Sequence, residues 1–379
     1  MKLPNRSENI ADPAERGRAD AGAPTNVSRF AYVGCYTSKE RGGQGAGISV
    51  FKIDPASGEW SKVQLCEVVN PSFLTFDRTW RFLFSAHGDD TFVTAFSIDR
   101  ETGRLTILNE QSTGGTNTVH LSVDPGNRFL VTANYGSGTL AAFPICGDGS
   151  LGALCDQVAL PGPGLDKKEP TFSHPHHIPF DVSGRFIVVP DKGLDKIFVF
   201  RLDTSTGRFL PNDPLSVQTR PGANPRHVVF HPNKPLAYVN DELASTVTTY
   251  YFDQDRGVLR EVQVLHTLPR EFAGISKTAE IVISPSGKFV YVSNRGHDSI
   301  TMFSVVEDTG CLSLIGWQST LGKTPRFITL DLPGDVLYAA NQDSNTIVSF
   351  QILDDGRLTP TGQVVRTGSP SCILFSRPG

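Results

Sequence analysis

Apolar and polar positions alternate along most of this chain in short runs, and such alternation is typical of β-strands. A recurring unit begins with an apolar run, turns through a polar group rich in Asp, Pro and Gly, and returns as a second apolar run. Six copies lie at 73–87, 120–134, 177–191, 227–241, 280–294 and 327–341. Amphipathic helical periodicity is absent from these stretches, so the pattern predicts an all-β protein.

A third apolar run and a glycine turn follow each unit. The turn glycines are Gly58, Gly103, Gly149, Gly207, Gly257, Gly310 and Gly356. Each follows polar residues and precedes an apolar one, as in a hairpin where Gly adopts a positive φ and Asp closes the turn. Successive glycines are 45 to 58 residues apart. Repeats of about this length with about four strands each are typical of a β-propeller.

The seventh copy is divided between the two ends of the chain. The C-terminus supplies one strand at 372–376, and the N-terminus supplies strands at 30–37 and 48–54. A ring explains this division, because strands from both ends can share the last blade and leave no open edge. We therefore predict one seven-bladed propeller of four-stranded antiparallel blades over 30–379, preceded by a disordered tail over 1–29.

Composition narrows the classes of partner. The 379 residues carry a net charge of −4 without a Lys/Arg block, which disfavours nucleic acid. No apolar stretch is long enough to cross a membrane, and the polar N-terminus lacks the apolar core of a secretory signal. The six cysteines show no C-x-x-C spacing, which favours free thiols in a reducing cytoplasm. A closed ring also favours a monomer.

Register within the repeats places charged side chains on one face of the ring. In a propeller blade the first strand lines the channel and the second runs back beside it. The start of the first strand and the end of the second therefore share a face. The side chains expected there include His120, His174, His176, Asp191, Lys192, Arg226, Glu242, Glu280, Arg295 and Arg326.

This set has two interpretations. The groups can pair with one another as ion pairs around the channel. Alternatively, converging arginines can bind a carboxylate or phosphate, a histidine can act as general base, and a glutamate can orient that base. Only some blades carry charges at these positions, which favours the functional interpretation.

Other motifs carry less weight. SHPHHIPF at 173–180 places histidines at alternate positions, but no second Cys or His pair completes a zinc site. We expect His177 to point into the blade packing. GGQGAG at 42–47 is not followed by a helix, and YGSGT at 135–139 lacks the spacing of a nucleophile elbow. We therefore expect neither a metal nor a cofactor.

Several segments together resemble one family. VGCYT, HLSVDP, ANYGSGTLAAFP, HPHHIPFD, NPRHVVFHP, NDELAST and AEIVISPSGKFVYVSNRGHDSI are similar to motifs of the seven-bladed β-propeller lactonases. That family includes bacterial 6-phosphogluconolactonases and a fungal carboxy-cis,cis-muconate cyclase. The resemblance covers about 30–377 and implies lactone chemistry without a metal.

The resemblance also implies an active site. In the cyclase branch a His, two Arg and a Glu form the proposed site, and by motif they fall on His176, Arg226, Arg295 and Glu242. The position of the His is open, because His174 and His177 share its motif.

On this basis we expect hydrolysis of a small anionic sugar lactone, 6-phosphoglucono-δ-lactone above all. Arg226 and Arg295 would hold the anion and stabilise the carbonyl oxygen, and His176 would activate water. Glu242 or Glu280 would orient that histidine. The expected substrate-binding residues are His120, His174, Asp191, Lys192, Lys277, Glu280 and Arg326. The alternatives are a muconate-type cyclase, a lactonase for a non-phosphorylated sugar lactone, and a scaffold that binds partners without catalysis.

Overall fold

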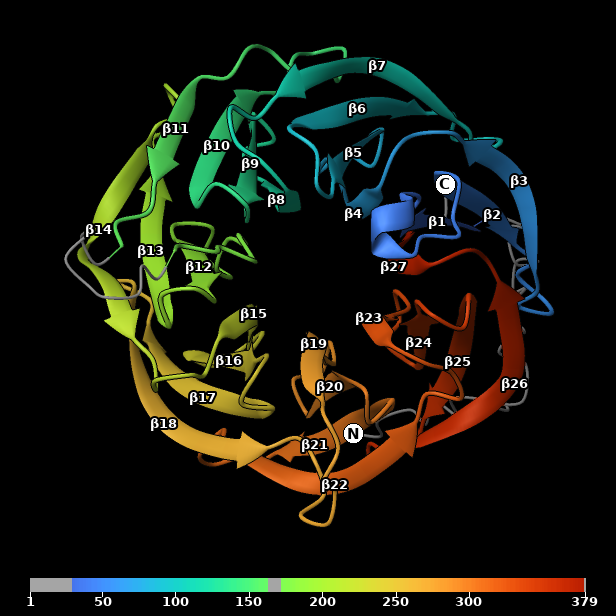
Figure 1. Ribbon diagram of the computed structural model, residues 1–379, viewed down its shortest axis with the longest axis vertical. Coiled ribbons are helices and arrows are strands. Elements are labelled where there is room, and N and C mark those ends of the chain that lie inside the picture. Colours follow the sequence, from blue (N-terminus) through green and yellow to red (C-terminus); the bar gives the residue numbers. More distant parts are fainter. Residues whose placement is uncertain (1–28, 163–171, 378–379) are drawn as a thin grey trace, which may run out of the picture.

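Seven antiparallel β-sheets surround a central channel in the computed structural model of the protein, which describes residues 29–162 and 172–377 (Figure 1). Each sheet is one blade, and its strands follow one another from the channel to the outside. The seven-bladed propeller predicted from the repeats is confirmed. The described helix is the three-residue 3-10 turn η1 (Lys39–Arg41), and no helix in these ranges could span a membrane.

The first three blades are formed by consecutive parts of the chain. Blade 1 contains β4 (Pro71–Phe76), β5 (Phe82–His87), β6 (Phe92–Ile98) and β7 (Leu105–Ser112). Blade 2 contains β8 (Thr118–Val123), β9 (Phe129–Asn134), β10 (Thr139–Pro144) and β11 (Asp156–Ala159). Blade 3 contains β12 (Ile187–Asp191), β13 (Lys196–Leu202) and β14 (Phe209–Gln218).

The remaining blades complete the ring. Blade 4 contains β15 (Pro225–Phe230), β16 (Leu236–Asp241), β17 (Thr246–Asp253) and β18 (Val258–His266). Blade 5 contains β19 (Lys277–Ile283), β20 (Phe289–Arg295), β21 (Ser299–Val305) and β22 (Leu312–Ser319). Blade 6 contains β23 (Pro325–Leu330), β24 (Val336–Asn341), β25 (Thr346–Ile352) and β26 (Leu358–Arg366). Blade 7 contains β27 (Pro370–Phe375), β1 (Arg29–Cys35), β2 (Ile48–Ile53) and β3 (Trp60–Cys66).

Blade 3 has an irregular inner edge. The segment 175–180 takes the place of its first strand, and two isolated bridges, Pro175 to Asp191 and Phe180 to Ile187, join it to β12. Two prolines, Pro175 and Pro179, remove backbone donors that a regular ladder would need. The histidine motif is therefore carried by a loosely paired strand.

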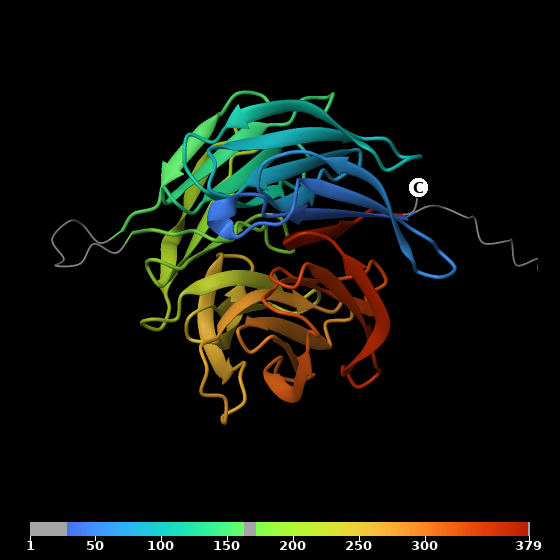
Figure 2. The same cartoon turned by 45° about the vertical axis from the view of Figure 1, so that its right-hand side comes forward.

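The ends of the chain close the ring, as the divided repeat predicts. β27 pairs antiparallel with β1, and Ala31 lies opposite Phe375 in that ladder. Figure 2 shows red β27 beside the blue strands of the N-terminal part. Apart from Arg29, which begins β1, the tail expected over 1–29 lies outside the described residues.

Acidic turn residues fix the hairpins between first and second strands. The Asp124 carboxylate accepts hydrogen bonds from the backbone N–H groups of Arg128 (2.6 Å) and Phe129 (2.7 Å). These bonds satisfy donors that the turn leaves unpaired. The corresponding carboxylates in other blades are Asp77, Asp181 and Asp331.

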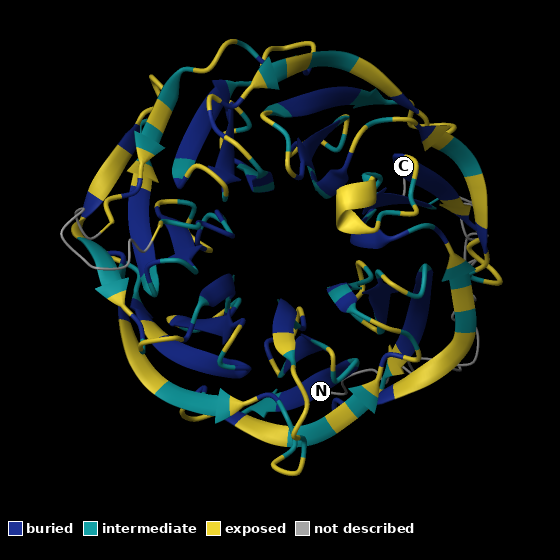
Figure 3. Ribbon diagram, viewed as in Figure 1, coloured by how far each residue is buried: buried dark blue, intermediate teal, exposed yellow. Residues whose placement is uncertain are grey.

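The apolar core lies between neighbouring blades. Phe84 and Val93 of blade 1, for example, belong to one buried cluster with Leu121 and Phe143 of blade 2. Figure 3 shows the inner strands as largely buried, whereas exposed residues recur along the outer strands. Burying side chains of this size stabilises the fold by about 1.5–3 kcal/mol each.

Outer hairpin turns lock one blade against the next. All seven turn glycines have positive φ, as predicted. The Tyr32 hydroxyl of blade 7 donates to the Gly103 carbonyl of blade 1 (2.9 Å). A Cβ at Gly103 would lie 2.3 Å from the ring of Phe30. Both the conformation and the close approach of the neighbouring blade therefore require glycine at this position.

This double requirement predicts that Gly103→Ala destabilises the protein more than Gly58→Ala. Both glycines have nearly the same φ, 72° and 71°, but nothing lies within 4 Å of a Cβ at Gly58. Gly58→Ala should cost about 1–2 kcal/mol from conformation alone. Gly103→Ala should cost about 1–3 kcal/mol more, from overpacking against Phe30.

Thermal unfolding followed by circular dichroism measures the difference. We expect the highest Tm for the wild type, a lower Tm for Gly58→Ala and the lowest Tm for Gly103→Ala. Equal losses in the two variants would show that the approach of Phe30 adds no constraint.

Candidate active site

Each inner strand begins at the same end of the channel, here called the upper end. A layer of side chains at this end points into the channel because the inner strands are bulged near their first residues. In blade 4, for example, the pairing shifts by one residue between Pro225 and His227. Such a bulge turns the extra residue out of the ladder. The extra residues in four blades are Ser72, Val119, Arg226 and Arg326. All four line a chamber that His176 of blade 3 also lines.

A second layer lies above this chamber, where the second strands of the blades end. Lys192 and Glu242 directly follow β12 and β16, and Arg295 ends β20. Tyr36 and Tyr135 occupy the same repeat position in blades 7 and 2. These residues line a cavity of about 230 Å³, here called the bowl. His176 and Arg326 line both the bowl and the chamber beneath it.

The Glu242 carboxylate is the meeting point of three cations in the bowl. Its Oε2 lies 2.9 Å from Lys192 Nζ and 3.2 Å from Arg226 Nε, and its Oε1 lies 3.2 Å from Arg295 Nη2. Glu242 and Arg226 are buried, and the other two side chains are largely so. Blades 3, 4 and 5 are thus joined by one charge network.

Backbone carbonyls hold the two arginines in place. Arg226 Nη1 donates to the Ala279 carbonyl, and Arg295 Nη2 donates to the Thr278 carbonyl (2.9 Å). Within the described chain, the buried Nε of Arg295 has no hydrogen-bond partner. A buried donor of this kind is suited to an anionic ligand.

Burial and charge shift the pKa values in this network. Burial alone would raise the pKa of Glu242, but Arg295, Lys192 and Arg226 together hold it well below its usual range. Burial lowers the pKa of Lys192 to about 8, although Glu242 opposes that change. Burial, with Arg295 nearby, lowers the pKa of Arg226 to about 10. Glu242 is therefore ionised at neutral pH, and Lys192 loses its proton at a pH just above neutral.

Further cations surround the bowl. Arg326 Nη2 donates to the Tyr36 hydroxyl (2.7 Å), and its guanidinium lies 4.9 Å from the centre of that ring. Arg41 of η1 pairs with Asp89 of blade 1, and Lys277 begins β19. Among the residues that the structure describes, the lining of the bowl carries five cationic side chains and one carboxylate, that of Glu242. This excess of positive charge favours an anionic ligand.

His176 lies beside these cations as a neutral imidazole. Burial lowers its pKa well below the usual value, and Arg226, His227 and Lys192 add to this effect. Its Nδ1 lies 3.2 Å from His227 Nε2, which leaves Nε2 for the cavity. A neutral imidazole in a site for anions can accept a proton from water.

A layer of rings lies immediately below and narrows the channel. The His120 ring contacts both Phe73 and His177, with ring centroids 4.2 and 4.1 Å apart. His177 also stacks on His227 at 4.3 Å. His177 therefore packs against the inner residues of adjacent blades. The chamber above this layer has a volume of about 20 Å³, which is room for about one water molecule.

The sequence-predicted residues divide into two groups. Eight of them line the two cavities. The bowl is lined by His176, Lys192, Glu242, Lys277, Arg295 and Arg326, and the chamber beneath it is also lined by Arg226 and Glu280.

His120, His174 and Asp191 lie around the cavity and support it. His120 belongs to the ring layer, because the bulge in β8 leaves Val119 at the chamber instead. His174 stacks on Tyr135 at 4.4 Å. Asp191 is fully buried and accepts hydrogen bonds from Ser173 Oγ and the His174 backbone N–H.

Several residues near the cavity, among them Tyr36, Arg41, Asn117 and His227, are absent from the sequence-based set. Tyr36 has the same repeat position as Glu242, so register alone could have identified it. Arg41 lies in η1, within a connection between second and third strands that is longer than its counterparts in the other blades. Asn117 directly precedes β8, as Asn70 precedes β4 and Asn224 precedes β15, so register could have identified it as well. His227 follows Arg226 directly, and its importance is visible only from its contact with His176.

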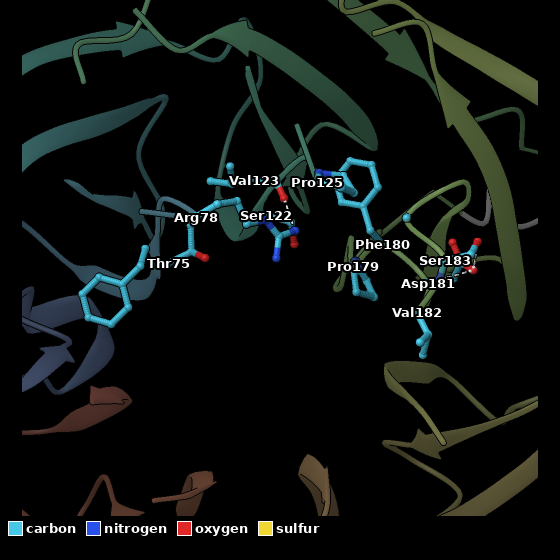
Figure 4. Close-up of a pocket in the computed structure, with 12 residues that line it drawn as sticks. Thr75, Arg78, Ser122, Val123, Pro125, Pro179, Phe180, Asp181, Val182 and Ser183 are labelled. Atoms are coloured by element: carbon cyan, nitrogen blue, oxygen red, sulfur yellow. Dashed lines mark hydrogen bonds between the residues drawn. The ribbon is translucent and has the colours of Figure 1, made fainter. Parts of the chain in front are cut away.

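A larger cavity, of about 520 Å³, lies at the opposite opening of the channel (Figure 4). Turns that follow β4, β8 and the segment 175–180 line it. Its charged groups are engaged in turn structure, since Arg78 donates to the carbonyls of Val123 and Asp124. The Asp181 carboxylate accepts the Phe186 N–H (2.8 Å). The bowl is therefore the better candidate for catalysis.

Comparisons with known proteins agree with this architecture. The family model described as lactonase, 7-bladed beta-propeller, matches residues 30–375. A 6-phosphogluconolactonase of Bacillus subtilis is 34% identical over 91% of this chain and 97% of its own length. A 6-phosphogluconolactonase of Formosa agariphila is 32% identical over 91% of this chain and 99% of its own length.

A solved structure gives the same result. The periplasmic gluconolactonase of Pseudomonas aeruginosa is 28% identical and superposes with a TM-score of 0.85. The match covers 93% of this chain and 100% of that structure. Because the family model spans nearly all of the described chain, the protein belongs to the seven-bladed β-propeller lactonase family.

Proposed function

We propose that this protein hydrolyses 6-phosphoglucono-δ-lactone to 6-phosphogluconate in the bowl. One observation carries the proposal: Arg226, Arg295 and Lys192 converge on Glu242 beside the neutral imidazole of His176. The 6-phosphogluconolactonases of Bacillus subtilis and Formosa agariphila, which match almost the whole chain, support the choice of substrate.

The charge of the bowl supports a phosphorylated substrate. Glu242 offsets only part of the charge of the cations that surround it, and the remainder attracts a dianionic phosphate. Arg326 and Lys277 line the bowl but do not pair with Glu242, and they are therefore suited to bind that group. Arg226 and Arg295 then face the lactone carbonyl.

Hydrolysis needs a base and a site for negative charge. The water oxygen bonds to the lactone carbonyl carbon, while one water proton passes to Nε2 of His176. The carbonyl oxygen gains negative charge, which the guanidinium donors of Arg226 and Arg295 stabilise. Collapse of this intermediate breaks the bond between that carbon and the ring oxygen, which takes the proton back. Each step uses side chains of this protein, and none requires a metal or cofactor.

A non-phosphorylated sugar lactone is a second candidate substrate. The gluconolactonase of Pseudomonas aeruginosa, which has the same architecture, favours it. The same general base and the same donors to the carbonyl oxygen would act on it. Only Arg326 and Lys277 would have no phosphate to bind.

Turnover of the two lactones tests the proposed substrate. Hydrolysis is followed by pH-stat, with spontaneous ring opening subtracted. We expect kcat/KM for 6-phosphoglucono-δ-lactone to exceed that for glucono-δ-lactone by about 100-fold or more, since a charged hydrogen bond contributes about 1.5–3 kcal/mol. An Arg326→Met, Lys277→Met double variant should remove most of this preference. Equal turnover of both lactones by the wild type would contradict the phosphate site.

Arg295→Met should lower kcat/KM about 100- to 1,000-fold, the usual effect of removing one donor to a developing oxyanion. The matched control is Arg357→Met, because Arg357 is exposed on an outer hairpin and, within the described chain, forms an ion pair with Asp355 alone. The control should retain wild-type turnover. Similar losses in both variants would indicate a general effect of removing arginine rather than a role in the bowl.

Binding of the product should weaken as Lys192 loses its charge. Because burial lowers its pKa to about 8, Lys192 is cationic below that pH and neutral above it. The Kd of 6-phosphogluconate, measured by calorimetry, should therefore rise up to about tenfold between pH 7 and pH 9, where phosphate is already ionised. Lys192→Arg stays charged and should remove this rise. A rise of the same size in Lys192→Arg would exclude Lys192 as its cause.

A further inference from the structure

Three side chains from neighbouring blades form a buried chain beneath the bowl. His176 Nδ1 lies 3.2 Å from His227 Nε2, and His227 Nδ1 lies 2.7 Å from Glu280 Oε1. All three residues are at most 6% exposed. All three line the chamber beneath the bowl, where bulk water does not compete for their hydrogen bonds.

Hydrogen-bond chemistry fixes the proton positions along this chain. An ionised Glu280 can only accept, so His227 carries its proton on Nδ1 and leaves a lone pair on Nε2. That lone pair requires a proton on Nδ1 of His176. The Nε2 of His176 is then unprotonated, which is the form that a general base needs.

Adjacent rings hold His227 in the required orientation. His177 stacks on His227 with an interplanar angle of 12°, and its Nδ1 accepts the Val228 N–H (3.1 Å). His120 Nδ1 accepts the Ile178 N–H (3.3 Å). Because backbone donors engage these two imidazoles, they fix the plane of His227 while remaining outside the chain.

We propose that His227 is a positioning residue which, with Glu280 behind it, selects the basic tautomer of His176 and relays its proton. This inference rests on the proposed lactone hydrolysis for its catalytic consequence. The arrangement itself is a property of the folded protein and can be tested without substrate.

The relay conserves protons. Water gives a proton to His176 Nε2 as its oxygen bonds to the carbonyl carbon. The Nδ1 proton of His176 moves to His227 Nε2, and the Nδ1 proton of His227 moves to Glu280. Both imidazoles remain neutral, and the negative charge moves from Glu280 to the substrate oxygen. When the ring oxygen leaves, it takes the proton from His176 Nε2, and the other two protons return.

Glu280 can take part in such a relay near neutral pH. Burial raises its pKa to about 7, against the opposing effects of Arg226, His177 and Arg326. His227 of blade 4 and Cys372 of blade 7 also face it. When Glu280 is protonated it donates to His227, both histidines change tautomer, and His176 Nε2 carries a proton. The base form of His176 is therefore present above about pH 7 and lost below it.

Two substitutions of His227 separate the relay from packing. His227→Phe keeps the stacked ring but removes the acceptor for His176, and we expect kcat to fall about 100- to 1,000-fold with KM changed less than about threefold. His227→Gln can still accept from His176 and donate to Glu280, so it should recover at least about tenfold in kcat. His87→Phe is the control, because His87 is a fully buried histidine of blade 1 outside the chain. It should keep the wild-type kcat.

The pH profile gives an independent readout. In the wild type kcat should rise with pH through about 7, and in Glu280→Gln this inflection should disappear. An unchanged kcat in a folded His227→Phe variant, or an unchanged inflection in Glu280→Gln, would overturn the inference. If the wild type were active in the same experiment, the proposed function would still stand.

Nuclear magnetic resonance tests the arrangement in the wild type itself. Long-range proton–nitrogen correlations of 15N-histidine report which ring nitrogen carries the proton, and a His176→Gln sample assigns the signal. At pH 8 we expect His176 protonated on Nδ1 alone. Protonation on Nε2 at that pH would overturn the inference, even if the wild type hydrolysed neither lactone and the proposed function had failed.

Discussion

The buried carboxylate of Glu242 is the interaction on which the channel mouth depends. Without it, cations from three blades would face one another in a region that excludes most water. Removing one partner from a buried charge network costs about 3–5 kcal/mol, because the remaining charges are left without compensation. Glu242 also fixes the guanidinium groups before substrate arrives. Such preorganised donors stabilise developing charge without having to reorganise during the reaction.

The propeller supplies this geometry through strand ends more than through long loops. Each blade contributes at least one residue, either at the start of its inner strand or at the end of its second strand. The segment 175–180 is the exception, because its prolines prevent a regular ladder and the segment presents His176 at the cavity. Tight contacts between blades, such as Tyr32 with Gly103, keep these strand ends in register around the ring.

Much of this architecture follows from the sequence. Turn glycines and acidic hairpin residues define the blades because few other residues satisfy those backbone positions, and the divided repeat reveals the closure. Register then identifies many of the residues at the channel mouth, including Glu242 and Arg295 in the bowl and Arg226 beneath it. It misplaces His120, because a one-residue bulge in β8 exchanges it with Val119 and periodicity carries no sign of such a shift. Arg41 and the partners of His176 depend on tertiary packing, which no repeat encodes.

A crystal structure of the protein with 6-phosphogluconate is the decisive experiment for the proposed function of the bowl. We expect the product in the bowl, with its carboxylate within hydrogen-bond distance of Arg295 or Arg226 and its carboxyl carbon beside His176 Nε2. The phosphate should lie at Arg326 and Lys277. Product bound instead in the cavity at the opposite opening, or in the bowl with its carboxylate away from both arginines, would show that these arginines do not bind the reacting group.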